Sequence, residues 1–272
     1  GEGIVSSLQY SLRLQELLLG IFAVSIGTVI LPDLSGLARR KEWESFTGMM
    51  TRAMQIIALI TIPVTFYSLI CGREIITLVY KSSHFTSDSV NLTLTAFRFH
   101  IAGLFFIALN RIISPAFYAQ GNTKLPTLAG IAGFVVNIIL ALLLVNPMKG
   151  GGIALALTIA SFANTVFLFA SLGTMHTVKT SVVLKPFIFY SLKITALSIL
   201  ASVPVYFIRR PLLNTFSPYN RLISQGIPLV CTAVVFAAVG IILLILTKDP
   251  IALLIAEKIK GKFHKSSKGQ NK

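Results

Sequence analysis

The sequence has little charge and few acidic residues. Only 12% of its 272 residues are charged, nine are Asp or Glu, and 54% are hydrophobic. With a mean hydropathy of +0.81, the chain has too few charged side chains to cover a soluble domain of this length. Four stretches contain no charged residue, and each is long enough for a helix to cross about 30 Å of hydrocarbon: 53–72, 125–148, 150–178 and 222–247. We therefore predict an integral membrane protein.

Groups that carry metal or catalytic chemistry are also scarce. The two cysteines lie far apart, no Gly-rich phosphate loop follows a strand, and no Ser/His/Asp or paired-carboxylate arrangement is visible. The histidines have no metal-ligand spacing: they are His84, His100, His176 and His264. The sequence predicts neither an enzyme nor a metal site.

The apolar segments predict about seven membrane spans in an all-α fold. Helices are expected because lipid cannot satisfy the backbone of an open strand. Short polar links predict antiparallel neighbours. The expected spans are roughly 4–31, 53–72, 91–118, 125–146, 152–173, 187–208 and 223–247.

Lysine and arginine predict the orientation. The formal net charge is +15, and no nucleic-acid-binding signature accompanies it, so we attribute it to membrane surfaces and predict no nucleic-acid partner. The loops after the first, third and fifth spans, together with the tail at 248–272, carry more Lys and Arg than the opposite side. The N-terminus is then outside and the C-terminus cytoplasmic. A cluster on the outer side, Arg209, Arg210 and Arg221, is the exception.

The first span carries polar residues on one helix face. Spacings of three and four align Gln9, Arg13 and Glu16 between Ser6 and Gly20. A charge at membrane depth costs about 2.5–3.5 kcal/mol on insertion scales, so this face should meet protein or a water-filled cavity. One interpretation is a cavity wall that offers Arg13 to an anionic substrate such as a pyrophosphate. The other is an internal Arg13–Glu16 ion pair that only positions the helix.

Other polar residues lie in or beside the spans. Arg52 and Arg111 either line a cavity mouth or extend to lipid headgroups. Asn137, Thr158 and Asn164 lie inside spans four and five. They either line a cavity, coordinate a cation, or form hydrogen bonds between helices.

Several separated motifs resemble one known family. The segments 8–14, 20–22, 27–35, 85–86 and 115–126 are similar, in order and spacing, to the MurJ/MviN family of lipid II flippases. The resemblance runs through the first five spans, with the last two as a more variable pair. It places the chain in the larger multidrug/oligosaccharidyl-lipid/polysaccharide exporter superfamily.

The resemblance implies a fold and a division of the chain. Family members have fourteen spans in two six-helix lobes plus two extra helices, and this chain would start at the eighth span. Residues 1–173 would form five spans of the second lobe, 174–247 two additional groove-forming spans, and 248–272 a basic cytoplasmic tail. The N-terminal half of the transporter would be a partner, and the chain would lie in the bacterial plasma (inner) membrane.

The resemblance also implies a function. Family members move lipid II, an undecaprenyl-diphosphate-linked peptidoglycan precursor, across the membrane by alternating access, with the lipid tail in a hydrophobic groove. Arg13 matches a cavity cation and Glu16 an acidic position on the same face. Leu12 departs from the family, in which many members have Asp before the Arg. Asn137 and Thr158 could contribute to a site for a coupling cation such as Na⁺; no other cofactor is implied.

Two other functions stay open. One is the export of another lipid-linked oligosaccharide or of a drug by a transporter of the same superfamily. The other is a non-transporting membrane scaffold, because a half transporter cannot build a two-lobed cavity alone.

Overall fold

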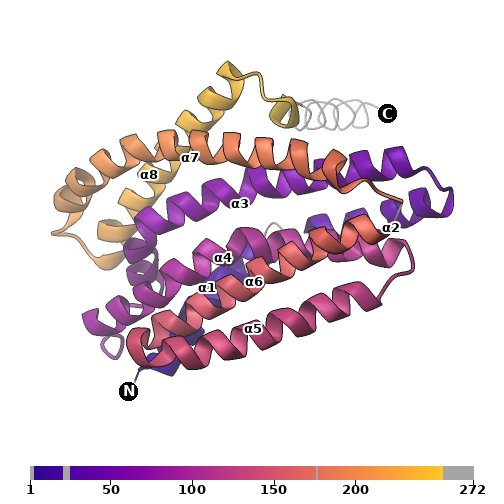
Figure 1. The fold of residues 1–272 in the computed structure, drawn as a ribbon. Coiled ribbons are helices and arrows are strands. Elements are labelled where there is room, and N and C mark those ends of the chain that lie inside the picture. The colour runs from indigo at the N-terminus through magenta and orange to yellow at the C-terminus, as the bar shows by residue number, and fades with distance from the viewer. Residues whose placement is uncertain (1–2, 21–24, 176, 254–272) are drawn as a thin grey trace, which may run out of the picture.

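A computed structural model describes residues 3–20, 25–175 and 177–253, and those residues form helices and turns without a strand (Figure 1). The elements, in chain order, are α1 (Ile4–Leu19), α2 (Ser25–Arg39), α3 (Trp43–Tyr80), α4 (Ser87–Ala119), α5 (Lys124–Met148), α6 (Gly150–Leu172), the short 3₁₀ helix η2 (Gly173–Met175), α7 (Thr180–Phe216) and α8 (Arg221–Leu246).

Six of the described helices, α3 to α8, are long and apolar enough to cross a membrane. They coincide with the last six predicted spans, but α3 and α7 are much longer than predicted, at 38 and 37 residues. A helix of that length measures roughly 55 Å, so its ends extend beyond the hydrocarbon. Hydropathy reports only the apolar middle of such a helix, which is why the predicted spans were too short.

The first predicted span, 4–31, corresponds to two helices in the described part of the chain. Helix α1 ends at Leu19 and α2 continues to Arg39, eight residues past the predicted end. Both helices pack against α4, and α2 also contacts α3. The polar end of α2 again extends beyond the apolar segment that hydropathy detects.

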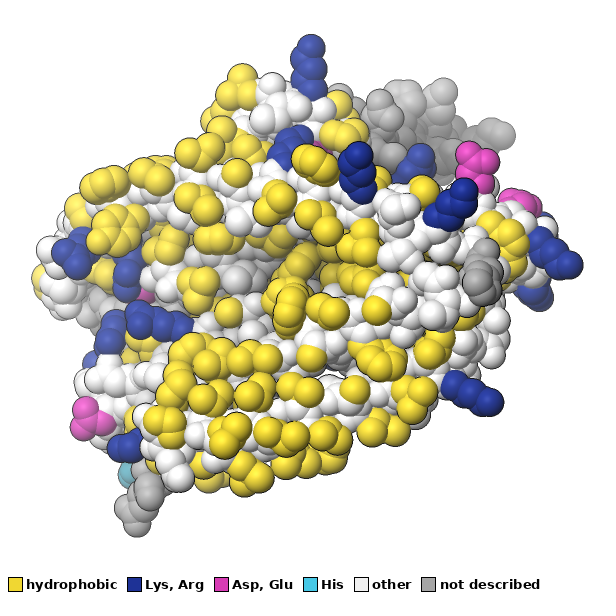
Figure 2. Space-filling model, in the orientation of Figure 1, with side chains coloured by type: hydrophobic (Ala, Val, Ile, Leu, Met, Phe, Trp, Pro, Cys, Tyr) yellow, Lys and Arg dark blue, Asp and Glu magenta, His cyan; other side chains and the backbone are white. Residues whose placement is uncertain are grey.

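Helix α4 is the centre of the bundle. It contacts α1, α2, α3 and α6, whereas α5 packs mainly on α6, and α8 packs on α7 and α3. In the most apolar 18-residue stretch of α5, and likewise of α8, only 11% is buried within the protein. Figure 2 shows hydrophobic side chains along the visible flank of the bundle, with Lys and Arg gathered mainly toward its ends. An apolar outer surface of this extent matches a lipid environment.

The helices alternate in direction, so the bundle has two ends. We call one the Lys149 end, where α1 and α4 begin, α3 ends, and the α5–α6 and α7–α8 turns lie. We call the other the Lys124 end, where the α2–α3, α4–α5 and α6–α7 connections lie. Residues that the predicted topology placed on the same side of the membrane lie at the same end of the bundle.

Two glycines permit close helix contact. A Cβ on Gly103 of α4 would lie 2.5 Å from Thr158 Oγ1 and 3.2 Å from Thr158 Cα in α6. A Cβ on Gly133 of α5 would lie 3.3 Å from the Ala160 carbonyl oxygen. Small residues at these points allow α4, α5 and α6 to approach closely, as is common between membrane helices.

Candidate functional site

The polar face of α1, which we define as Gln9, Arg13 and Glu16, is exposed. Ser6 and Gly20 at its two ends are exposed as well. No Arg13–Glu16 ion pair occurs among the salt bridges of the described residues. An exposed arginine on a helix of an otherwise apolar bundle leaves its guanidinium donors available to a ligand or to another protein surface.

The opposite face of α1 is fixed to α4. Ser11 Oγ lies 2.7 Å from His100 Nδ1, and Gln15 Nε2 donates to the His100 carbonyl oxygen. The Ser11, Gln15 and His100 side chains are buried. These buried bonds fix the rotation of α1, so its polar face points away from the bundle core.

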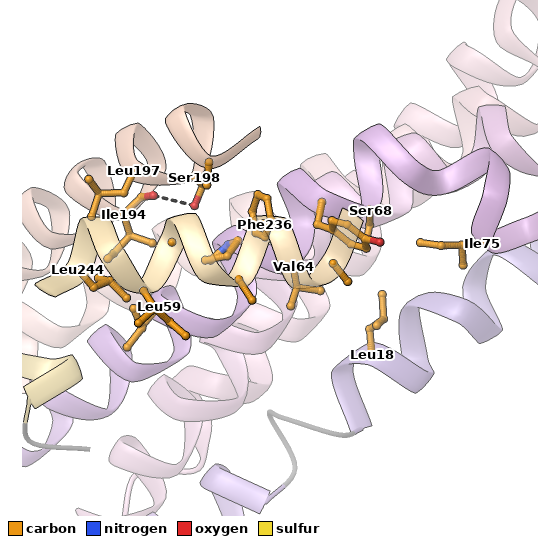
Figure 3. Close-up of a pocket in the computed structure, with 17 residues that line it drawn as sticks. Leu18, Leu59, Val64, Ser68, Ile75, Ile194, Leu197, Ser198, Phe236 and Leu244 are labelled. Carbon is orange, nitrogen blue, oxygen red and sulfur yellow. Dashed lines mark hydrogen bonds between the residues drawn. The ribbon is translucent and has the colours of Figure 1, made fainter. Parts of the chain in front are cut away.

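An apolar groove of about 450 Å³ lies between α3, α7 and α8, and α1 adds Leu18 (Figure 3). Its wall comes in equal part from α3 and α8, with fewer residues from α7, so the two C-terminal spans form the groove together with an earlier helix, which the sequence did not predict. The lining residues are Leu18, Leu59, Pro63, Val64, Tyr67, Ser68, Ile75, Ile194, Leu197, Ser198, Ala201, Ala233, Phe236, Ala237, Gly240, Ile241 and Leu244.

Two of the three hydroxyl groups in the groove wall, those of Tyr67 and Ser198, have partners within the protein. Ser198 Oγ donates to the Ile194 carbonyl oxygen at 2.7 Å, as Figure 3 shows. Tyr67 Oη donates to the Leu229 carbonyl oxygen at 2.7 Å. With these hydroxyl groups engaged, the groove presents an apolar surface that suits a hydrocarbon chain.

Arg52 and Arg111 lie apart from the groove. Arg52 is exposed and lines a cleft of about 700 Å³ at the Lys124 end, between α3 and the start of α7, together with Lys179. Arg111 is exposed on α4. Neither residue lines the groove.

The polar residues of spans four and five lie at the α4–α5–α6 contacts. Thr158 Oγ1 donates to the Phe99 carbonyl oxygen at 2.6 Å, so part of this set serves hydrogen bonding between helices. Asn137 Oδ1 and Asn164 Oδ1 are buried and have no hydrogen-bond partner in the described residues. Buried unpaired oxygens of this kind call for a water molecule, a cation or another donor.

Sequence reasoning missed two ion pairs with a buried acid, Glu74–Arg209 and Asp249–Lys193. Glu74 Oε1 accepts from Arg209 Nε at 2.8 Å and from Arg209 Nη2 at 2.6 Å, which joins α3 to α7. One member of the exceptional arginine cluster is therefore paired with an acid. The two residues are 135 positions apart, and no spacing rule connects them.

A multi-pass helical membrane protein with an exposed polar helix face and an apolar groove has the architecture of a membrane transporter lobe. The family model described as "Lipid II flippase MurJ" matches residues 1–224. This chain belongs to the MurJ family.

Similar proteins agree with this assignment. The chain is 45% identical to the probable lipid II flippase MurJ of Treponema pallidum over 95% of its own length and 49% of that protein. It is 30% identical to the one from Rickettsia prowazekii, over 64% of the chain and 34% of that protein. A solved structure of a lipid II flippase MurJ in an inward closed conformation matches with a TM-score of 0.73 at 26% identity, over 92% of this chain and 49% of that one. The match thus spans about half the length of the Treponema pallidum protein and of the solved structure, and about a third of the Rickettsia prowazekii protein.

Proposed function

We propose that this chain is the C-terminal portion of a flippase that moves lipid II across the bacterial inner membrane by alternating access. The observation that carries the proposal is the exposed Arg13 on the polar face of α1, whose helix also contributes Leu18 to the apolar groove. A lipid-linked diphosphate has a dianionic group and a long hydrocarbon tail. Helix α1 contributes an arginine, which suits the diphosphate, and one residue of the groove wall, which suits the hydrocarbon tail.

In this proposal Arg13 binds the diphosphate. Its planar guanidinium can donate two parallel hydrogen bonds to phosphate oxygens, which a lysine cannot. Glu16, one turn away, balances the charge of Arg13 on the polar face without pairing with it, and Gln9 extends the polar face toward the sugar groups. The tail of the lipid lies in the groove between α3, α7 and α8.

The N-terminal half of the transporter would complete the cavity. The polar face of α1 is exposed because this chain supplies one wall, and the second lobe would stand opposite it. The function we propose is transport, without a catalytic step. Asn137, Asn164 and Thr158 would be the place for a coupling cation, since Asn137 Oδ1 and Asn164 Oδ1 accept no hydrogen bond from the part of the chain that the structure describes. Arg52 and Arg111 would attract the anionic headgroup to the mouth of the cavity.

The proposed orientation places the Lys124 end in the cytoplasm and the Lys149 end outside. Lys and Arg are more numerous at the Lys124 end and in the 248–272 tail. The cluster Arg209, Arg210 and Arg221 at the Lys149 end argues less strongly against this orientation, because Glu74 neutralises the charge of Arg209 within the protein. The N-terminus of the chain would then be outside.

The test is survival of a bacterium depleted of its own flippase. The chain joined to an N-terminal lobe should support growth, whereas Arg13→Ala in that joined protein should not, and Arg13→Lys should rescue at most partly. Arg98→Ala, an exposed arginine on α4, is the matched control and should grow. Growth of the Arg13→Ala protein at the wild-type rate would remove Arg13 from the mechanism. Failure of the joined wild type, with normal expression, would favour another lipid-linked substrate or a scaffold role.

A further inference from the structure

A polar pocket of about 440 Å³ lies at the Lys149 end, and no residue of α1 lines it. It lies between the end of α3, the start of α4, the end of α7 and the start of α8. The apolar groove lies between the same three helices α3, α7 and α8, farther from this end. The two spaces share no lining residue. The pocket is therefore a second site.

An incompletely bonded carboxylate lines this pocket. The Glu74 side chain is buried, with 3% of the residue exposed. Two nitrogens of Arg209, Nε and Nη2, donate to Glu74 Oε1, and Glu74 Oε2 is buried without a hydrogen-bond partner among the described residues. Leaving a charged oxygen unbonded is costly, so the pocket favours a ligand that brings an N–H or O–H donor.

The charge of the pocket favours an anion. Arg209 already neutralises Glu74, and Arg73 and Lys81 line the same space with exposed side chains. Arg73 Nη2 donates to Asn91 Oδ1 at 2.7 Å, and its remaining donors are available. Two cations beside a neutralised carboxylate repel a metal ion and attract a phosphate group.

The position of the pocket favours a lipid. Its walls are the polar ends of helices, which lie at the depth of lipid headgroups. Phe207, Leu222 and Val230 on α7 and α8 are exposed large hydrophobic residues near these ends, available to acyl chains. A phospholipid headgroup combines a phosphodiester with a hydroxyl or ammonium donor, which is the combination that the pocket demands.

We propose that this pocket binds a phospholipid headgroup, with Arg73 and Lys81 holding the phosphate and Glu74 Oε2 accepting a hydrogen bond from the headgroup's hydroxyl or ammonium group. The bound lipid links the end of α3 to the α7–α8 turn, so it supports the outer part of the helices that form the groove. This inference is independent of the proposed transport function.

The experiment is native mass spectrometry of the full chain, delipidated in detergent and titrated with three lipids of identical acyl chains. Phosphatidylglycerol supplies hydroxyl donors, phosphatidylethanolamine an ammonium donor, and phosphatidylcholine the same phosphate without any N–H or O–H donor. We expect at least one of the first two to bind about tenfold tighter than phosphatidylcholine, the ratio that one charge-assisted hydrogen bond gives. The tighter of the two identifies the donor.

Variants assign the contacts. Glu74→Gln keeps an oxygen for Arg209 but places an amide donor at the second position, so the preference over phosphatidylcholine should disappear. The double variant Arg73→Gln/Lys81→Gln should weaken the tight lipid about tenfold or more. Both residues are exposed, so the fold should persist, which circular dichroism checks. Lys149→Gln removes an exposed cation at the same end that does not line the pocket, and it should leave binding unchanged.

Three results would overturn the proposal. Equal binding of the three lipids would show that Glu74 accepts no headgroup donor. Unchanged binding by the Arg73→Gln/Lys81→Gln variant would place the lipid elsewhere. Displacement of the lipid by an equal concentration of inorganic phosphate would show a site for a free anion.

Discussion

Gly103→Ala should destabilise the α4–α6 contact strongly. A new Cβ would lie 2.5 Å from Thr158 Oγ1 and 3.2 Å from both Thr158 Cα and Cβ, far inside van der Waals contact. The nearest atom belongs to a hydroxyl that donates to the Phe99 carbonyl oxygen, so moving it breaks that bond. The backbone of α6 at Thr158 Cα limits how far the contact can relax.

The magnitude can be built from three contributions. Overpacking a tight contact costs about 1–3 kcal/mol. Loss of the Thr158–Phe99 hydrogen bond costs about 1 kcal/mol more. Replacing Gly by Ala in a helix interior returns about 0.5–1 kcal/mol. The free energy of unfolding should therefore fall by about 1–3 kcal/mol.

A double-mutant cycle makes this reasoning specific. Thr158→Ala alone loses one hydrogen bond, about 1 kcal/mol. In Gly103→Ala/Thr158→Ala the hydroxyl that clashes is gone and the hydrogen bond is lost only once. The double variant should be more stable than the sum of the single effects predicts, by about 1 kcal/mol or more.

The assay is reversible unfolding of the purified protein in mixed micelles, followed by circular dichroism. Gly130→Ala is the matched control, because a Cβ there meets nothing within 4 Å and the variant should be neutral or slightly more stable. Additive single effects, or a Gly103→Ala protein as stable as the Gly130→Ala protein, would refute the close approach of α4 and α6.

Two further predictions concern the ends of the bundle and its interior. Asp249 is fully buried and accepts from Lys193 Nζ at 2.7 Å. Burial alone would raise the pKa of the Asp249 carboxyl, but the hydrogen bond and charge of Lys193, together with the hydrogen bonds from the Ala252 N–H and Tyr190 Oη, outweigh burial and hold the pKa below its ordinary value. Because the pKa of Asp249 is lower in the folded protein, its ionised carboxyl stabilises the fold at pH values above the ordinary pKa of about 4. That stability is lost as the pH falls through the lowered pKa. Asp249→Asn should remove that pH dependence and cost about 1–3 kcal/mol, measured by unfolding across pH; a variant with the wild-type pH profile would contradict this. Ser11→Ala should leave His100 Nδ1 without its partner and lower the unfolding free energy by about 1–3 kcal/mol in the same assay, whereas Ser6→Ala, on the exposed face, should not.

The membrane class and the positions of the spans could be predicted from local sequence. Uncharged stretches of this length allow few folded states other than helices in lipid, so α3 to α8 were all expected. The ends of the long helices were not predicted, since polar residues beyond the hydrocarbon carry no hydropathy signal. The polar face of α1 was predicted as well, because helical spacing alone places Gln9, Arg13 and Glu16 together.

By itself, the sequence determined a helical membrane protein whose first span presents an arginine on one face, because hydropathy and helical periodicity are local properties. Only the tertiary structure decided that Arg13 is exposed and not paired with Glu16, since rotation of α1 is set by its buried contacts with α4. It also decided that α3 forms a wall of the groove and that Glu74 meets Arg209. Contacts between residues far apart in the chain depend on how helices pack, and no local pattern encodes that packing.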